Sequence, residues 1–237
     1  MEMIEMDSFT NFDQIIKREK EERIRKMRED TVRIESLPDE EIISKATRML
    51  GDLDLGFDDL VDKKVVDLGS GAQIIERAAT IKGLETVFSV DSREYVLSKR
   101  PEVKNGIVGN IIKGIPQIPD NSIDLLISRA GPPTISRKKE HADDSIVEIL
   151  RMLKSGGRAV IGPINFHFIE EEHDRYQELL KKKYQDKKEL TDSEKDEINE
   201  IKKIMEEESK KYLEEKNIKV TTERSKTMNW SYGIITK

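Results

Sequence analysis

The stretch around residue 70 carries the residue types of a nucleotide-binding turn. A short apolar run ends in a carboxylate, then a glycine-containing turn leads into helical spacing; the residues are Asp67, Gly69, Ser70, Gly71 and 74–79. Glycine permits the unusual backbone angles of such a turn and lets a ligand approach the main chain closely. The N-terminus of the following helix adds unpaired N–H groups and a partial positive charge. The pattern indicates a site for a nucleotide-like cofactor.

A second carboxylate strengthens this interpretation. Asp91 ends the β-rich run at residues 87–90 and stands about 20 residues beyond the turn, where an acidic side chain commonly binds ribose hydroxyls. Two glycines in a loop often occur by chance, so the turn alone is a weak signal. The order strand, turn, helix, strand and carboxylate makes it stronger.

Three more β-rich runs follow, and two of them are preceded by distinctive motifs. The runs are residues 106–110, 123–128 and 158–162. Residues 118–128 read Pro-Asp-Asn-Ser, a hydrophobic residue and Asp before the fourth strand, and residues 148–158 contain Leu-Arg-Met-Leu-Lys-Ser-Gly-Gly-Arg before the fifth. With these motifs, the turn and Asp91, the chain resembles the class I S-adenosylmethionine (SAM) dependent methyltransferases, in particular the small single-domain members.

The resemblance covers roughly residues 59–164 and implies a fold. We expect an α/β, Rossmann-like, doubly wound seven-stranded sheet with an antiparallel C-terminal hairpin, N-terminal helices, and a charged helical insertion before the last two strands. One domain is expected for the whole chain, 1–237. Its parts would be an N-terminal helical segment (1–58), a cofactor-binding core (59–164), a charged helical segment (165–216) and the hairpin (217–237).

The resemblance also implies SAM as cofactor and assigns positions around it. Asp67, Gly69, Ser70 and Gly71 would meet the methionine end, Asp91 and Ser92 the ribose, Asn110 and Ile111 the adenine, and Ser128 and Arg129 the transferable methyl. Some of these residues have simpler interpretations that stay open. Asp67 could be a structural carboxylate that binds loop N–H groups, and the polar residues that end the fourth strand could cap a loop.

The sequence points to catalytic residues less clearly than to cofactor-binding ones, as expected for an enzyme that uses this cofactor. The methyl group of SAM is already electrophilic, so the protein has mainly to align the reactants, exclude water and sometimes remove a proton. Arg129 and His167 are the candidates for that work. No spacing of ligand residues suggests a metal site. The chain departs from the family at Gln73, where a third glycine is usual, and residues 131–134 lack the motif of enzymes that methylate exocyclic nitrogens.

Composition limits the remaining possibilities. Of 237 residues, 35% are hydrophobic and 38% charged, cysteine is absent and the formal net charge is −6. We therefore expect no disulfides, no membrane span, no strong nucleic-acid signal and a cytoplasmic location. The N-terminal residues 1–33 should be helical, with Phe9 to Ile16 either docked on the surface or packed over the cofactor site.

Three helix boundaries are predicted from capping residues. Ser36 should begin one helix that Gly51 ends, Ser145 should begin another, and Thr191 should begin the second of two helices in the charged region. That helical pair is interpreted as a solvated surface with one docked face. A lid over the substrate and a surface for homodimer formation are the alternatives.

Three functions compete. The first is SAM-dependent methyl transfer to an unidentified acceptor, expected to be a small molecule. The second is a nicotinamide-dependent oxidoreductase, against which the missing third glycine and the two later motifs argue. The third is a non-catalytic protein that binds SAM and acts as a scaffold through its charged helices.

Overall fold

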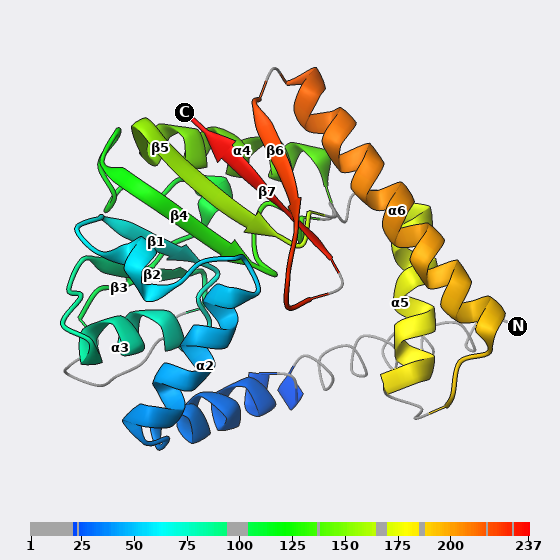
Figure 1. Cartoon of the computed structure of the whole chain (residues 1–237), viewed down its shortest axis with the longest axis horizontal. Helices are drawn as coiled ribbons and strands as arrows, with labels where there is room; N and C mark the ends of the chain where they lie inside the picture. Colours follow the sequence, from blue (N-terminus) through cyan, green and yellow to red (C-terminus); the bar gives the residue numbers. More distant parts are fainter. Residues whose placement is uncertain are drawn as a thin grey trace, which may run out of the picture.

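A central sheet with helices on both faces forms the body of the molecule (Figure 1). The structure, a computed structural model, describes residues 21–22, 24–93, 104–136, 138–164, 170–184, 188–216, 218–228 and 230–237. The strands are β1 (Val65–Leu68), β2 (Val87–Asp91), β3 (Gly106–Val108), β4 (Ile123–Arg129), β5 (Leu153–Gly162), β6 (Val220–Arg224) and β7 (Ser231–Thr236). After a first helical segment, residues 24–35, the helices are α2 (Asp39–Gly51), α3 (Ile74–Ile81), α4 (Lys139–Met152), α5 (Glu170–Tyr184) and α6 (Asp192–Glu215).

In the described ranges the sheet has seven strands in the order β3-β2-β1-β4-β5-β7-β6. The first five strands are parallel, and β7 runs antiparallel to both β5 and β6. The predicted doubly wound sheet with its antiparallel C-terminal hairpin is therefore confirmed. The carboxyl ends of β1 to β5 and the beginning of β7 lie along one edge, which we call the carboxyl edge.

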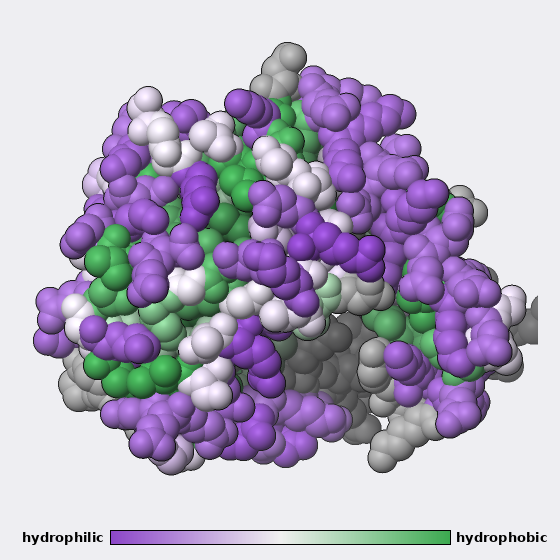
Figure 2. Space-filling view, in the orientation of Figure 1, coloured by the Kyte–Doolittle hydropathy of each residue, from purple (hydrophilic) through white to green (hydrophobic). Residues whose placement is uncertain are grey.

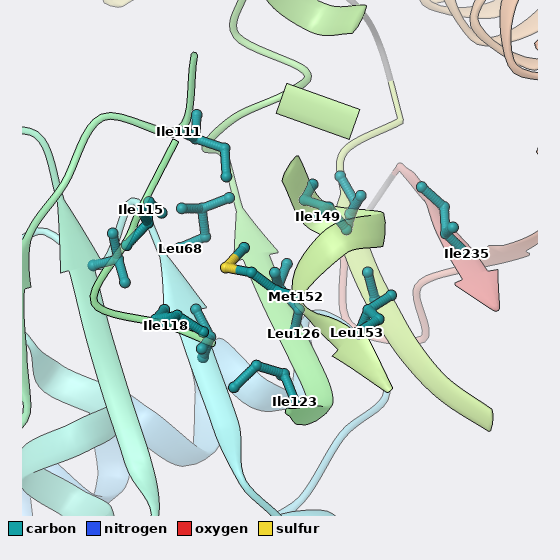
Figure 3. Close-up of a cluster of buried hydrophobic side chains, with 14 residues drawn as sticks. Leu68, Ile111, Ile115, Ile118, Ile123, Leu126, Ile149, Met152, Leu153 and Ile235 are labelled. Carbon is teal, nitrogen blue, oxygen red and sulfur yellow. The ribbon is translucent and has the colours of Figure 1, made fainter. Parts of the chain in front are cut away.

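Successive residues of the central strands are buried on opposite faces of the sheet. Val66 and Leu126 pack with α4 and with the 3-10 turn η3 (Ile111–Lys113), in a cluster that has Met152 at its centre (Figure 3). Their neighbours Val65 and Leu125 pack on the other face with residues of α2 and α3. Because both faces are covered, these strands are apolar nearly throughout, as expected for parallel sheets.

Two predicted helix starts are wrong. The N-cap of α2 is Pro38 and not Ser36, whose hydroxyl instead donates to the carbonyl of Arg33 in the preceding helical segment. Ser145 lies inside α4, where its hydroxyl donates to the carbonyl of His141, four residues earlier. In both cases the serine satisfies a carbonyl of its own helix, a common use of this side chain that competes with capping. The predicted end of α2 at Gly51 is confirmed.

The charged region forms two helices, as predicted. Thr191 and Glu194 make the reciprocal capping box that begins α6. Leu179 and Leu190 pack with the first half of α6 in a small apolar cluster, while Tyr212 and Leu213 dock its second half onto α4. Figure 2 shows hydrophilic side chains over the outside of α6, with hydrophobic residues where α5 and α6 meet. Docking along one face thus supports the simplest interpretation for α6.

No helix in the described part of the chain is long and apolar enough to cross a membrane. Phe9 to Ile16, expected near the cofactor site, lie outside the described residues.

Candidate functional site

A cavity of about 450 Å³ opens at the carboxyl edge, where β1, β2 and β3 end. We call it the β1–β3 cavity. Five of the residues predicted to bind the cofactor line it: Gly69, Asp91, Ser92, Asn110 and Ile111. The order of the strands brings these residues together from three separate parts of the sequence, as parallel strands with a common carboxyl edge should.

The other predicted residues do not line this cavity. Asp67 is buried in β1, Ser70 and Gly71 belong to the turn after that strand, and Ser128 and Arg129 end β4. They form a layer behind the cavity wall or beside it.

The turn after β1 is held against β2. The N–H groups of Gly69 and Ser70 both donate to the carbonyl of Val90, at 2.7 and 3.1 Å. Gly69 has a φ of 74°, and a Cβ there would lie 3.3 Å from Cδ of Pro132, in the loop after β4. Both the left-handed backbone and the close approach require glycine. The turn therefore brings the ends of β1, β2 and β4 into contact.

Two buried polar atoms behind this turn have no hydrogen-bond partner among the described residues: Asp67 Oδ2 and Ser70 Oγ. Burial, followed by the nearby carboxylates of Glu76 and Asp91, raises the pKa of Asp67 to about 7. Buried polar atoms are normally paired, so an unpaired carboxylate oxygen indicates a missing partner. A positively charged hydrogen-bond donor is the partner that would stabilise the ionised carboxylate best. The alternative that Asp67 binds loop N–H groups receives no support at this oxygen.

Asp91 accepts four hydrogen bonds. Its Oδ1 accepts from Nε and the backbone N–H of Arg93, at 2.8 and 2.9 Å, and its Oδ2 accepts from a terminal nitrogen of Arg93 and from Gly71 N–H, at 2.9 and 3.1 Å. A carboxylate offers about four acceptor positions, so all of them are used. Hydroxyl groups of a ligand can reach Asp91 only if the Arg93 side chain moves away.

Sequence reasoning did not assign a role to Arg93, although the spacing Asp-x-Arg is visible. Its guanidinium also donates to the sulfur of Met27, at 3.4 Å, so the helical segment 24–35 touches the group that covers Asp91. Arg93 lines the β1–β3 cavity and its side chain is 38% exposed. It is therefore placed where it can both block the carboxylate and swing into solvent.

Gln73 fills the position of the usual third glycine without losing the turn. It adopts the left-handed conformation with a φ of 55°, and its amide donates to Glu76 at 2.7 Å. Glu76 in turn accepts from the backbone N–H of Asn105, just before β3. The glutamine thus holds Glu76, which links α3 to the residue before β3, and a glycine at position 73 could not make this contact.

The polar residues at the ends of β3 and β4 hold loops. The Oδ1 of Asn110 accepts from Ile112 N–H at 3.0 Å and caps η3, so that Ile111 and Ile112 form an apolar side of the cavity. The buried hydroxyl of Ser128 donates to the carbonyl of Pro132 at 2.6 Å. These contacts agree with the loop-capping alternative for Ser128.

Arg129 is engaged away from the cavity. Its guanidinium forms an ion pair with the buried Asp52, at 2.6 and 2.7 Å, and the other oxygen of Asp52 accepts from the Thr227 hydroxyl at 3.0 Å. The pair joins β4 to the end of α2 and to the connection between β6 and β7. His167 lies outside the described residues, and in the described ranges no three metal-ligand side chains gather in one place.

Comparison with known proteins identifies the segment that holds the cavity. Residues 66–161, from the second residue of β1 to the penultimate residue of β5, match a family described as "Methyltransferase domain". A comparison with curated proteins found no match.

Two solved structures are similar in fold. One is a candidate SAM-dependent methyltransferase of Methanococcus maripaludis, with 18% identity, 83% of this chain and 89% of that chain covered, and a TM-score of 0.49. The other is a SAM-dependent methyltransferase of Aquifex aeolicus, with 17% identity, 84% and 98% covered, and a TM-score of 0.43. Likenesses this weak carry no argument about the function of this chain.

Proposed function

We propose that this chain, whose residues 66–161 match a methyltransferase domain, is a class I SAM-dependent methyltransferase that transfers the methyl group to a small-molecule acceptor. The observation that carries the cofactor assignment is the unpaired, buried Asp67 Oδ2 behind the Gly69–Gly71 turn. It offers a negative charge beside a cavity of suitable size, and SAM bears a positive ammonium group at its methionine end.

In this proposal the residues around the β1–β3 cavity bind successive parts of the cofactor. Asp67 and Ser70 attract the ammonium end, with Gly69 and Gly71 keeping the main chain accessible. Asp91 and Ser92 take the ribose hydroxyls once Arg93 has moved. Ile111 flanks the adenine, and Asn110 keeps η3 folded beside it. The residues present fit the cofactor, because its hydroxyl-bearing and apolar parts meet Asp91 and Ile111 in the cavity wall, and its cationic part meets the unpaired carboxylate oxygen of Asp67 in the layer behind that wall.

Catalysis by such a chain is mainly alignment. The bound cofactor supplies an electrophilic methyl on its sulfonium, and the acceptor supplies the electron pair. The protein contributes by fixing the ends of β1 and β4 relative to each other through the packing of Gly69 and Pro132. Effective molarities of well-oriented groups reach about 10⁵ M or more, so positioning alone can provide much of the rate. Arg129, tied to Asp52, would orient the end of β4, while catalytic roles for Arg129 and His167 stay predictions.

Calorimetry with S-adenosylhomocysteine (SAH), the product of the methyl donor, tests the proposal. Binding of SAH in preference to NAD is expected, and it should disappear in Asp91→Ala. Preferential binding of NAD would favour the oxidoreductase, the second function considered. A chain that binds SAH but transfers no labelled methyl to any component of a cell extract would favour the scaffold protein. The cytoplasmic location and the homodimer stay predictions.

A further inference from the structure

A second cavity of about 450 Å³ lies at the carboxyl edge, beyond the end of β5 and next to α5 and α6. We call it the α5–α6 cavity. Its walls come from both helices, from β6, from the start of β7 and from Pro163 and Ile164, which follow β5. The walls lie outside residues 66–161, so the family match says nothing about this cavity.

One face of α6 and Arg224 of β6 give the cavity its charged groups. Asn199, Lys202, Lys203 and Glu206 have the spacing i, i+3, i+4, i+7 and all line it. Glu206 accepts from the Ser231 hydroxyl at 3.0 Å and pairs with Lys210 at 2.9 Å, so its negative charge is balanced. The two lysines therefore leave the cavity with an excess of positive charge.

Aromatic side chains supply the apolar part. Trp230 and Tyr176 line the cavity from the sheet and from α5. The indole of Trp230 lies so close to the end of β5 that a Cβ on Gly162 would come within 2.1 Å of it. Only glycine leaves room for this contact, which fixes the ring at the carboxyl edge. A fixed aromatic face that is half-buried is a good platform for a planar ligand.

The position of the cavity suits a methyl acceptor. Gly162 pairs with Arg129 at the end of β4, and the loop after Arg129 lines the β1–β3 cavity. Neighbouring strands lie about 4.8 Å apart, so the Trp230 wall begins within one or two strand spacings of that loop. Two cavities side by side along one edge are the arrangement that a two-substrate reaction needs.

We infer that the α5–α6 cavity binds a small organic anion with a planar apolar group, and that this is the chemical class of the methyl acceptor. Anion binding at this cavity does not depend on the proposed function; only the statement that the anion is the methyl acceptor rests on it. Lys202 and Lys203 would hold the anion, Trp230 would contact the planar group, and the nucleophilic atom would point toward the end of β4. Lysines act as point charges, so carboxylates and phosphate esters are both suitable.

Fluorescence of the intact protein tests the binding half directly. The chain has a single tryptophan, Trp230, so its emission reports this cavity. Benzoate and phenyl phosphate should quench or shift it with saturation, and comparing the two distinguishes carboxylate from phosphate recognition. Benzyl alcohol, which has the ring without the charge, and acetate, which has the charge without the ring, should bind about tenfold more weakly or worse. If benzyl alcohol binds as tightly as benzoate and phenyl phosphate, the inference is overturned.

A pair of matched variants locates the charge. The double variant Lys202→Gln/Lys203→Gln should bind benzoate about 10- to 100-fold more weakly, because each lysine contributes a charge-assisted hydrogen bond. Lys211→Gln removes one positive charge from an exposed position of α6 outside the cavity and should change nothing, and each single variant, Lys202→Gln or Lys203→Gln, is compared with it charge for charge. Retained secondary structure by circular dichroism shows that the double variant is folded. Unchanged benzoate binding in the folded double variant would contradict the inference.

A labelling experiment tests the acceptor half. Labelled SAM and the protein are incubated with the small-molecule fraction of a cell extract, and the products are separated by anion exchange. Label should appear in molecules that are still anionic, because the charge held by the lysines is not the reacting atom. Label only in neutral or cationic products would overturn the acceptor assignment. Failure of SAH to bind would refute the proposed function instead, while benzoate binding at Trp230 would be unaffected by that result.

Discussion

The β1–β3 cavity and the α5–α6 cavity have the same volume but opposite character. The first is built from Leu68 to Ser136, with Asp91 and its partner Arg93 in its wall and Asp67 behind that wall. The second is built from Pro163 to Ser231 and presents Lys202 and Lys203. Carboxylates thus lie in and behind the wall of one cavity, and lysines line the other, along one edge of the sheet. If both proposals hold, electrostatics as well as shape would direct the cationic ligand to the first cavity and the anionic one to the second.

The largest expected effect comes from removing Asp91. Asp91→Ala should weaken SAH binding at least about 100-fold, because the hydroxyls of the ligand lose a charged acceptor. Calorimetry measures this loss. Benzoate binding reported by Trp230 should stay the same, and a change of less than threefold for SAH would remove Asp91 from the cofactor site.

The burial of Asp67 predicts an effect on stability with a definite sign. Its pKa in the folded protein, about 7, is above the ordinary value of 3.8, so the folded state binds more protons between these two pH values. The stability contributed by the protonated group is full below pH 4 and is lost as pH rises through 7. The difference in unfolding free energy between Asp67→Asn and wild type should therefore rise, in favour of the variant, by roughly 2–3 kcal/mol from pH 5 to pH 8.

Urea denaturation of both proteins at the two pH values measures this gain. If the two stability curves remain parallel, Asp67 is already ionised and compensated in the folded protein.

Asp67 should also make SAH binding depend on pH. A cationic ammonium group favours the ionised carboxylate, and the ionised fraction of a group with a pKa near 7 rises about tenfold from pH 6 to pH 8. SAH affinity should rise by about the same factor, and Asp67→Asn should show weaker, pH-independent binding. Binding at the α5–α6 cavity should not follow this profile, which separates the two cavities experimentally.

Arg93 is expected to compete with the ligand. Because it fills acceptor positions of Asp91, Arg93→Ala should tighten SAH binding about three- to tenfold. Arg33→Ala, which changes an exposed arginine of the segment 24–35, provides a control. Weaker binding in Arg93→Ala would mean that the guanidinium contacts the ligand and does not compete with it.

The smallest effect is expected at Gln73. Gln73→Gly relieves a left-handed backbone but removes the hydrogen bond to Glu76, and the two changes should cancel to within about 1 kcal/mol of unfolding free energy. SAH affinity should change less than threefold. A large gain in affinity would show that the third glycine of related turns acts on the ligand directly.

The fold could be predicted because its signals are local. Apolar strands such as Val65–Leu68, the turn at Gly69 and the motif at residues 150–158, which spans the end of α4 and the first half of β5, each lie in one short piece of sequence. Parallel strands then align their carboxyl ends. The same rule placed Asp91 and Asn110 in one cavity. Helix starts at Ser36 and Ser145 were predicted wrongly, because serine can satisfy a carbonyl of its own helix as well as cap the next one.

The α5–α6 cavity could not be predicted in this way. Its lysines lie on a helix whose charges otherwise suggest a solvated surface, and Trp230 reaches it from the far end of the chain. Only the docking of α6 onto α4 and the gap at Gly162 bring them together. The hydrogen bonds from Arg93 that occupy the acceptor positions of Asp91 were missed for a related reason. The sequence spacing shows that Arg93 is near Asp91, but not in which direction its side chain points.

The link from Arg129 through Asp52 to Thr227 has a consequence for how the enzyme is made. It joins positions 77 and 175 residues apart, and such distant contacts form late because closing long loops costs entropy. A growing polypeptide that has not yet reached Thr227 can form the β1–β3 cavity. It cannot yet form the contact from Asp52 to Thr227 that holds Arg129 and the end of β4. The two cavities are therefore complete only when the β6–β7 hairpin has been synthesised, and we expect the nascent chain to have no activity until then.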